Sequence, residues 1–353
     1  MEKIISILYS SIYHIDNDIK QVFEKKLGEN DVKNYVSQVI SDLMVISNTR
    51  KCEFKKDAKL IFFIDDITKN YDEAAITIED KEILRQNDNK RKIAEQLLNA
   101  EIKAKKHEEN LKMKITKGSL LQALVETESG YCFILSKIEH EPYIDNEEMK
   151  KRYGLPYKKI TLKCCTIDMN ENFDIVEIKV SDTASSIAKY WREDFLEVNT
   201  LINNTDNTKT MYSSVNKVLR RYLKAKSPKD FNFMQQKVNH YIASNPEYKH
   251  SEMIDYLMGT FSPDERLDID KTQMIKELKN IPEKYSIDSQ FEIDLKSVQK
   301  GLKQQVTVSD GIDLSYEGNP DELKKKIKGV MENGFKVLKI LGVNQDVYNL
   351  FKE

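Results

Sequence analysis

The sequence predicts an α+β protein, in which an antiparallel sheet follows N-terminal helices and precedes a C-terminal helical subdomain. Alternating apolar and polar residues fill two segments between residues 117 and 182, and each segment is interrupted by a short polar turn. Helical spacing of apolar residues dominates on both sides of this block. We expect three parts: an α+β domain at 1–181, a helical subdomain at 182–290, and closing strands with a C-terminal helix at 291–353.

The N-terminal region is predicted to be mainly helical. Residues 1–47 carry apolar residues at mostly helical spacing, broken near Gly28, which indicates a pair of helices. The short apolar run LIFFI at 60–64 is typical of a strand. From 79 to 110 a long charged helix with a narrow apolar stripe is expected.

The central sheet is predicted from two hairpins. Residues 117–140 read as two strands joined at 128–130, and residues 157–182 repeat the pattern with a turn at 169–172. The polar connector at 141–156 is expected to be a loop or a short surface helix. Together these segments predict an antiparallel sheet of at least four strands.

Four amphipathic helices are expected between residues 183 and 260. Asp182 or Thr183 can cap the first, which runs through residue 198, and Asp230 can cap the third. Gly259 closes the fourth. Strand-like alternation returns at 291–318, before a lysine-rich helix at 321–329 and an apolar tail at 335–343.

Composition excludes several classes of function. Lys and Arg (56) nearly balance Asp and Glu (58), so attraction to a polyanion must come from local clusters of charge. The five His and four Cys show no metal-ligand spacing. The sequence contains no phosphate-binding glycine loop and no nucleophile elbow. We therefore expect no metal and no cofactor. The cysteine usage and the lack of a membrane-spanning segment predict a cytoplasmic protein.

One local cluster of charge stands out between residues 207 and 229, where all seven charged residues are positive. On a helix, Val215, Leu219 and their neighbours Val218 and Tyr222 gather on one side. The opposite side carries four basic residues: Lys217, Arg220, Arg221 and Lys224. We expect the apolar side to be buried and the basic side to contact an anionic partner, although such a face is often only solvated.

Further basic clusters could add contacts to the phosphate backbone. Such clusters occur near residues 103–106, 112–117, 150–152 and 324–328. We expect the cluster of Lys150, Lys151 and Arg152 in the connector to assist the helix face. If two or more clusters converge in the fold, salt-sensitive binding to duplex DNA without sequence preference becomes available.

A nuclease is a weaker hypothesis from the same sequence. Asp168 ends one predicted strand, and Glu177 and Lys179 alternate on the next. Carboxylates on neighbouring strands can hold Mg²⁺ beside a lysine, but the same pattern is typical of the solvent face of any half-exposed sheet.

The order of these segments resembles the bacterial 37-kDa nucleoid-associated protein family. The resemblance rests on the hairpin KGSLLQALVETESGYCFILSKIEH with the following KKITLKCCTIDM, on SIAKYWREDFLE, on the helical block with FNFMQQKVNHYI, and on FEIDLKSVQKGLKQQVTVSDGIDLSYEG, and it covers roughly residues 114–320. It implies a non-enzymatic, nucleoid-located protein that binds DNA, and family members also occur beside mobile-element and phage-defence genes. It supplies no set of binding residues.

We therefore expect a sequence-independent DNA-binding protein that is not an enzyme. The alternative, from a different class, is a protein-interaction or assembly module whose basic face docks an acidic partner or the chain's own acidic segment at 139–148. A homodimer is compatible with either function.

Overall fold

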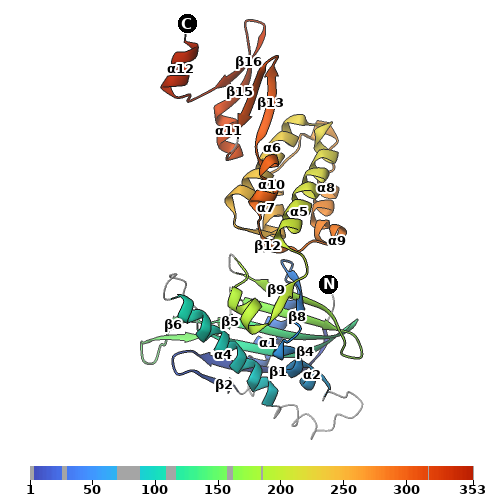
Figure 1. Ribbon diagram of the computed structural model, residues 1–353, viewed down its shortest axis with the longest axis vertical. Helices are drawn as coiled ribbons and strands as arrows, with labels where there is room; N and C mark the ends of the chain where they lie inside the picture. The colour runs from blue at the N-terminus through green and yellow to red at the C-terminus, as the bar shows by residue number, and fades with distance from the viewer. Residues whose placement is uncertain are drawn as a thin grey trace. The chain divides into compact units, whose positions relative to one another are not determined.

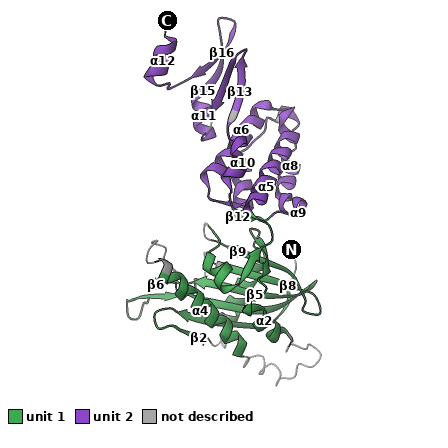
Figure 2. Ribbon diagram, in the orientation of Figure 1, with its two compact units in different colours: residues 1–203, 288–291 green, residues 204–287, 292–353 purple. Residues whose placement is uncertain are grey.

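The computed structural model describes residues 4–25, 30–69, 88–108, 117–156, 162–183, 186–316 and 318–352. The chain forms two compact units, shown in Figure 2: unit 1 contains residues 1–203 and 288–291, and unit 2 contains residues 204–287 and 292–353. The predicted division into parts at 1–181, 182–290 and 291–353 stays a prediction.

Unit 1 is built on an eight-stranded antiparallel sheet with the order β10-β3-β9-β8-β5-β4-β1-β2. Its strands are β1 (Ile4–Asp16), β2 (Gln21–Lys25), β3 (Arg50–Phe54), β4 (Gly118–Thr127), β5 (Gly130–Glu139), β8 (Leu162–Met169), β9 (Ile175–Asp182) and β10 (Val198–Thr200). The predicted hairpins are therefore confirmed as β4–β5 and β8–β9. Gly130 is required at the first turn, because its φ of +139° lies outside the range that L side chains adopt readily.

Helices cover both faces of this sheet (Figure 1). On one face lie α2 (Lys59–Lys69), α4 (Asp88–Glu108) and the π-helix η1 (Tyr190–Phe195), whose Trp191 is fully buried. The other face is covered by α1 (Asn30–Met44). All four cysteines are free and buried, Cys52 and Cys165 in the first core and Cys132 and Cys164 in the second.

For several segments of unit 1 the predicted kind of secondary structure was wrong. Residues 4–16 form β1, not a helix, and pair with β4 along most of their length. LIFFI lies in α2, not in a strand, because Leu60, Ile64 and Ile67 recur at helical spacing and are all buried. The connector forms a hairpin of β6 (Glu141–Ile144) and β7 (Lys151–Gly154), not a loop or a helix. Of the long helix expected at 79–110, residues 88–108 are confirmed and residues 79–87 and 109–110 lie outside the described ranges.

A short returning segment completes unit 1. The Asp288 carboxylate pairs with the Arg50 guanidinium, 3.6 Å from its Nε, and both side chains are almost fully buried. Asp288 also accepts a hydrogen bond from the backbone N–H of Lys51 at 2.9 Å. The Gln290 side chain bonds the backbone of Asp182 through both its amide nitrogen and its amide oxygen. Residues 288–291 are therefore anchored in the sheet unit although unit 2 supplies the chain on either side of them.

Unit 2 begins as a helical block. It contains α5 (Asn204–Leu219), the π-helix η2 (Arg220–Lys224), α6 (Pro228–Ser244), β11 (Glu247–Lys249), α7 (His250–Met258), the 3₁₀-helix η3 (Glu265–Leu267), α8 (Lys271–Lys279), α9 (Ile281–Tyr285) and α10 (Leu295–Leu302), and β12 (Gln290–Glu292) lies at the boundary between the units. The Ser227 side chain caps α6 by accepting from the Asp230 N–H, so the cap lies three residues before the expected one. The first predicted helix is the short π-helix η1, whose N-cap is Lys189 and carries no side-chain cap. The Asp182 carboxylate accepts a hydrogen bond at 3.1 Å from the backbone N–H of Ala188, just before η1 begins.

The C-terminal part of unit 2 consists of small elements. These are the hairpin β13 (Gln304–Ser309) and β14 (Ile312–Tyr316), helix α11 (Pro320–Lys326), the hairpin β15 (Ile327–Glu332) and β16 (Phe335–Ile340), and helix α12 (Gln345–Phe351). The expected closing hairpin is confirmed as β13–β14, and residues 295–302 are a helix where strand-like alternation was expected. No helix in the described ranges combines the length and the apolar character needed to cross a bilayer.

Candidate nucleic-acid interface

The basic face predicted from the sequence lies on α5 and its continuation η2. Val215, Leu219 and Leu223 are fully buried between this helix and its neighbours in unit 2. The basic residues on the other side are all exposed: Lys217, Arg220, Arg221 and Lys224. The structure thus brings all four predicted residues onto one solvent-facing side of a single helix.

The π-helical turn explains how this face continues to the end of the helix. In η2 the backbone closes i to i+5 hydrogen bonds, so the helix widens locally without a break. It ends before Pro228, which lacks the N–H that a continuing helix would need and instead begins α6.

Two of the four basic side chains have contacts that hold them in place. The Arg221 Nη1 lies 2.5 Å from Oε2 of Glu277 on α8, and the Tyr222 hydroxyl donates to the other oxygen of the same carboxylate at 2.8 Å. The hydrogen bond from Tyr222, together with the positive charge of Arg221, lowers the pKa of Glu277. The Arg220 guanidinium lies over the Phe231 ring, 5.8 Å from its centroid.

The other two are free to bind an external anion. Lys217 and Lys224 form no ion pair with any residue in the described part of the chain. Lysine and arginine also outnumber aspartate and glutamate in unit 2, whereas the reverse holds in unit 1. Unit 2 is therefore the part of the chain with the charge balance that favours a polyanion.

The second predicted cluster lies on the β6–β7 hairpin of unit 1 and is largely neutralised there. Lys150 Nζ lies 3.1 Å from Glu148, and Arg152 lies 3.0 Å from Glu148 and 3.7 Å from Asp145. Lys151 lies over the Tyr153 ring, 5.4 Å from its centroid. Because carboxylates of the same hairpin compete for these charges, this cluster is the weaker candidate for binding an anion.

The alternative nuclease residues also meet, but as an ion-pair network. Asp168 and Glu177 lie directly opposite each other on β8 and β9. Lys179 bridges them, with Nζ 2.7 Å from Asp168 and 2.8 Å from Glu177, and Lys51 lies 2.5 Å from the second oxygen of Glu177. Burial alone would lower the pKa of Lys179, but the hydrogen bonds with Asp168 and Glu177 outweigh it and raise that pKa.

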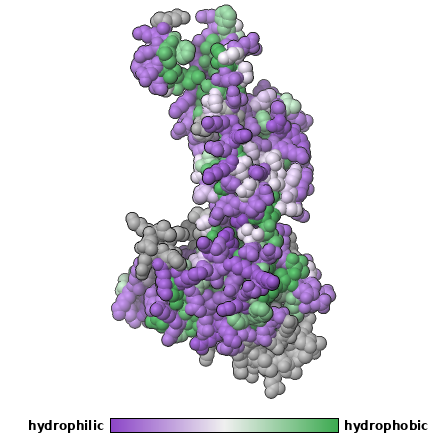
Figure 3. Space-filling view, in the orientation of Figure 1, coloured by the Kyte–Doolittle hydropathy of each residue, from purple (hydrophilic) through white to green (hydrophobic). Residues whose placement is uncertain are grey.

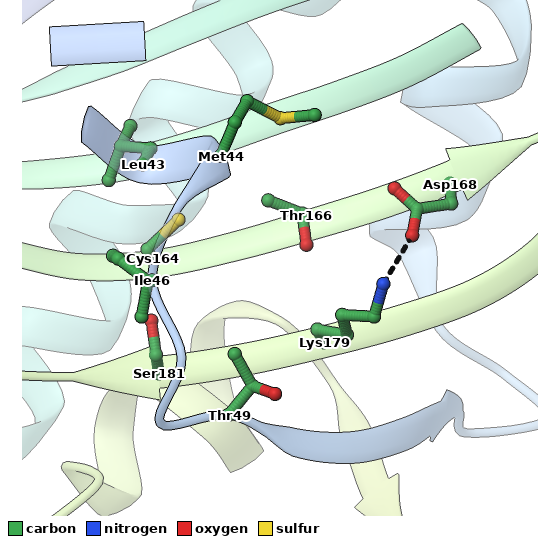
Figure 4. A pocket seen from close by; sticks show the side chains of 9 residues that line it. All are labelled: Leu43, Met44, Ile46, Thr49, Cys164, Thr166, Asp168, Lys179 and Ser181. Atoms are coloured by element: carbon green, nitrogen blue, oxygen red, sulfur yellow. Dashed lines mark hydrogen bonds and ion pairs between the residues drawn. The ribbon is translucent and has the colours of Figure 1, made fainter. Parts of the chain in front are cut away.

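This network borders a cavity of about 360 Å³ between the end of α1 and the sheet. Figure 4 shows Asp168 and Lys179 joined at its rim, with Leu43, Met44 and Ile46 on the opposite wall. Both carboxylates are already paired with lysines, and the described residues contain no group of three or more His, Cys, Asp or Glu placed to hold a metal ion. The arrangement fits the expected polar face of a sheet better than a metal site.

The family model described as nucleoid-associated protein YejK matches residues 91–328, which is more than half of the chain. The chain belongs to this nucleoid-associated protein family. The match confirms the resemblance inferred from the segments between 114 and 320. A comparison with curated proteins found no match.

Within the YejK-family match lie most of the central sheet, all of the α5–η2 basic face and the β13–β14 hairpin. Sequence reasoning missed Glu277 and Lys51, which bind residues of the two predicted sites. Glu277 lies 56 positions from Arg221 in the chain, so no local pattern could indicate the contact.

Proposed function

We propose that this chain is a nucleoid-associated protein of the cytoplasm that binds duplex DNA without reading its sequence and without catalysis. Its principal contacts are Lys217, Arg220, Arg221 and Lys224, and Lys150, Lys151 and Arg152 supply weaker contacts from unit 1. The observation that carries the proposal is the exposure of all four helix residues on one face of a protein from a nucleoid-associated family.

The dimensions of the basic face suit a phosphate backbone. From Lys217 to Lys224 the helix rises by about 10 Å, and one DNA strand carries a phosphate roughly every 3.4 Å along the axis. The face therefore spans about three phosphate intervals, or three to four phosphates of one strand, which matches its four charges. Such contacts position a protein on DNA and carry no sequence information.

The test is a salt titration of binding to two fluorescent duplexes of unrelated sequence, measured by anisotropy. We expect similar affinity for both duplexes and a slope of log K against log salt of about −3 to −4, as three to four phosphate contacts require. Arg220→Glu with Arg221→Glu should weaken binding by at least about a hundredfold at low salt and make the slope shallower by about two.

A matched control is Lys33→Glu with Lys56→Glu, which changes the net charge by the same amount at two exposed residues of unit 1. This control should lose much less affinity than the arginine pair. Equal losses would mean that only total charge matters and would refute the interface. Unchanged DNA binding in the arginine variant would favour an acidic protein partner for this face.

A further inference from the structure

The C-terminal 32 described residues of unit 2 expose several large apolar side chains. None of residues 321–352 is buried, and Met331, Phe335 and Phe351 are 65%, 74% and 83% exposed. Figure 3 shows this apolar surface as green atoms over β15, β16 and α12. A lone two-stranded hairpin is at best marginally stable in water, and large apolar patches mark interaction sites. The β15–β16 hairpin is therefore incomplete by itself.

The hairpin presents an unused edge along β15. Within the described structure β15 pairs with β16 alone, and the two strands are joined by a two-residue turn in which Asn333 and Gly334 both have positive φ. Such a turn makes Glu332 and Phe335 the hydrogen-bonded closing pair. The backbone groups of Gly329 and Met331 then point away from β16, toward the open edge.

We propose that β15 pairs with β15 of a second copy of this chain, antiparallel and about a two-fold axis at Val330. In this register Gly329 lies opposite Met331 of the second copy, so the outward backbone groups of both strands are hydrogen-bonded to each other. Lys328 lies opposite Glu332 of the second copy, and the symmetry forms this ion pair twice.

The charges on β15 and β16 favour a second copy of the chain as the partner of the β15 edge. Lys328 lies directly opposite Lys339 in its own hairpin, an unfavourable pair, and Glu332 contacts Lys339. Lys328 has no carboxylate partner among the residues that the structure describes. Glu332 of a second copy supplies the missing opposite charge. A register shifted by one residue loses both ion pairs. It also places backbone N–H and C=O groups that point to the open edge of one β15 opposite groups that point toward β16 in the other copy.

Pairing also turns two marginal hairpins into one four-stranded sheet. On one face of the hairpin lie Ile327, Met331, Leu338 and Ile340, and the second copy continues that face across the two-fold axis. Sheets of three or more strands with a hydrophobic face reach independent stability. This dimer uses none of the proposed DNA contacts, so either proposal can fail without the other.

Cysteine crosslinking tests the register. Val330→Cys places two thiols across a non-hydrogen-bonded pair, where Cα atoms lie about 4.5 Å apart, within the range of a disulfide. Met331→Cys places them roughly 8 Å apart, beyond that range. After mild oxidation, a non-reducing gel should show a crosslinked dimer for Val330→Cys and little for Met331→Cys. The four native cysteines are buried and do not compete.

Charge substitution tests the ion pairs in solution by sedimentation equilibrium. Lys328→Glu relieves the repulsion with Lys339 inside the hairpin but sets two glutamates against each other in the dimer, so it should raise the dimer dissociation constant about tenfold. Lys328→Glu with Glu332→Lys restores opposite charges and should recover most of that loss. Lys336→Glu, on the far strand, is the matched control and should change it little.

Three results would overturn the proposal. These are a wild-type chain that stays monomeric at its highest soluble concentration, equal crosslinking of the two cysteine variants, and a dissociation constant that Lys328→Glu leaves unchanged.

Discussion

At the scale of single residues, Glu277 limits the positive charge that the basic face presents. Its carboxylate lies 2.5 Å from Arg221 and 2.8 Å from the Tyr222 hydroxyl. In the proposed complex, the DNA phosphates compete with this carboxylate for the Arg221 guanidinium. The four basic residues could be predicted from helical spacing, because spacing decides which side chains share a face. Their partner could not, because it comes from a helix distant in the sequence.

Removing the charge of Glu277 should therefore strengthen DNA binding. Glu277→Gln keeps the shape of the side chain and frees Arg221, and half-exposed ion pairs of this kind contribute about 0.2 to 1 kcal/mol. We expect affinity for duplex DNA to rise by up to about fivefold in the anisotropy assay. Tyr222→Phe, which changes no charge, is the control. Equal or weaker binding by Glu277→Gln would show that this carboxylate does not oppose the ligand.

At the scale of elements, long amphipathic segments were predicted well and short apolar runs were not. The helix at 88–108 and the hairpins of the sheet carry clear periodicity over many residues. LIFFI is too short for its period to decide between strand and helix, and it became helical because the flanking residues extend its buried face to Ile67. In β1, alternate burial is set by pairing with β4, which the local sequence does not show.

Glu101 of α4 forms a buried ion pair. The sequence does not single out this residue, because α4 carries many charged residues. The Lys137 Nζ on β5 lies 2.5 Å from Oε1 of Glu101, and both side chains are fully buried. Asn17 donates to the other oxygen of Glu101 at 2.5 Å. These contacts join α4 to β5 and to the turn that follows β1.

Glu101→Ala should destabilise unit 1 by about 3 to 5 kcal/mol, because it leaves the Lys137 ammonium buried without its counter-charge. Urea unfolding can be followed by the fluorescence of Trp191, the only tryptophan in the chain, which is fully buried in unit 1. Glu95→Ala, on the exposed side of the same helix, should cost less than about 0.5 kcal/mol. If both variants lower the free energy of unfolding by similar amounts, the buried pair contributes no more to stability than an exposed ion pair.

At the scale of the whole molecule, unit 1 is closed by a segment that lies far along the chain. Residues 288–291 belong to it because Asp288 reaches the buried Arg50 and Gln290 bonds Asp182. Sequence patterns indicate where elements begin and end, but not which distant segment completes a core. Each predicted part was therefore one continuous stretch of sequence, and a unit that includes the distant residues 288–291 could not be predicted.

Asp288→Ala should lower the stability of unit 1 by about 3 to 5 kcal/mol, because the Arg50 guanidinium would stay buried without its carboxylate. The measurement is again the urea transition reported by Trp191. Asp264→Ala, which removes an exposed local partner of Arg266 in unit 2, is the control and should leave that transition unchanged. A transition unaffected by Asp288→Ala would show that the ion pair between Asp288 and Arg50 does not stabilise unit 1.

The four buried cysteines of unit 1 can report the order in which its two cores open. Burial raises the pKa of Cys52 and of Cys164 to about 12, so native thiols react with alkylating reagents only when the core around them opens. Cys52 and Cys165 report on the face under α2 and α4, and Cys132 and Cys164 report on the face under α1. The order in which they are alkylated records which helical layer leaves the sheet first.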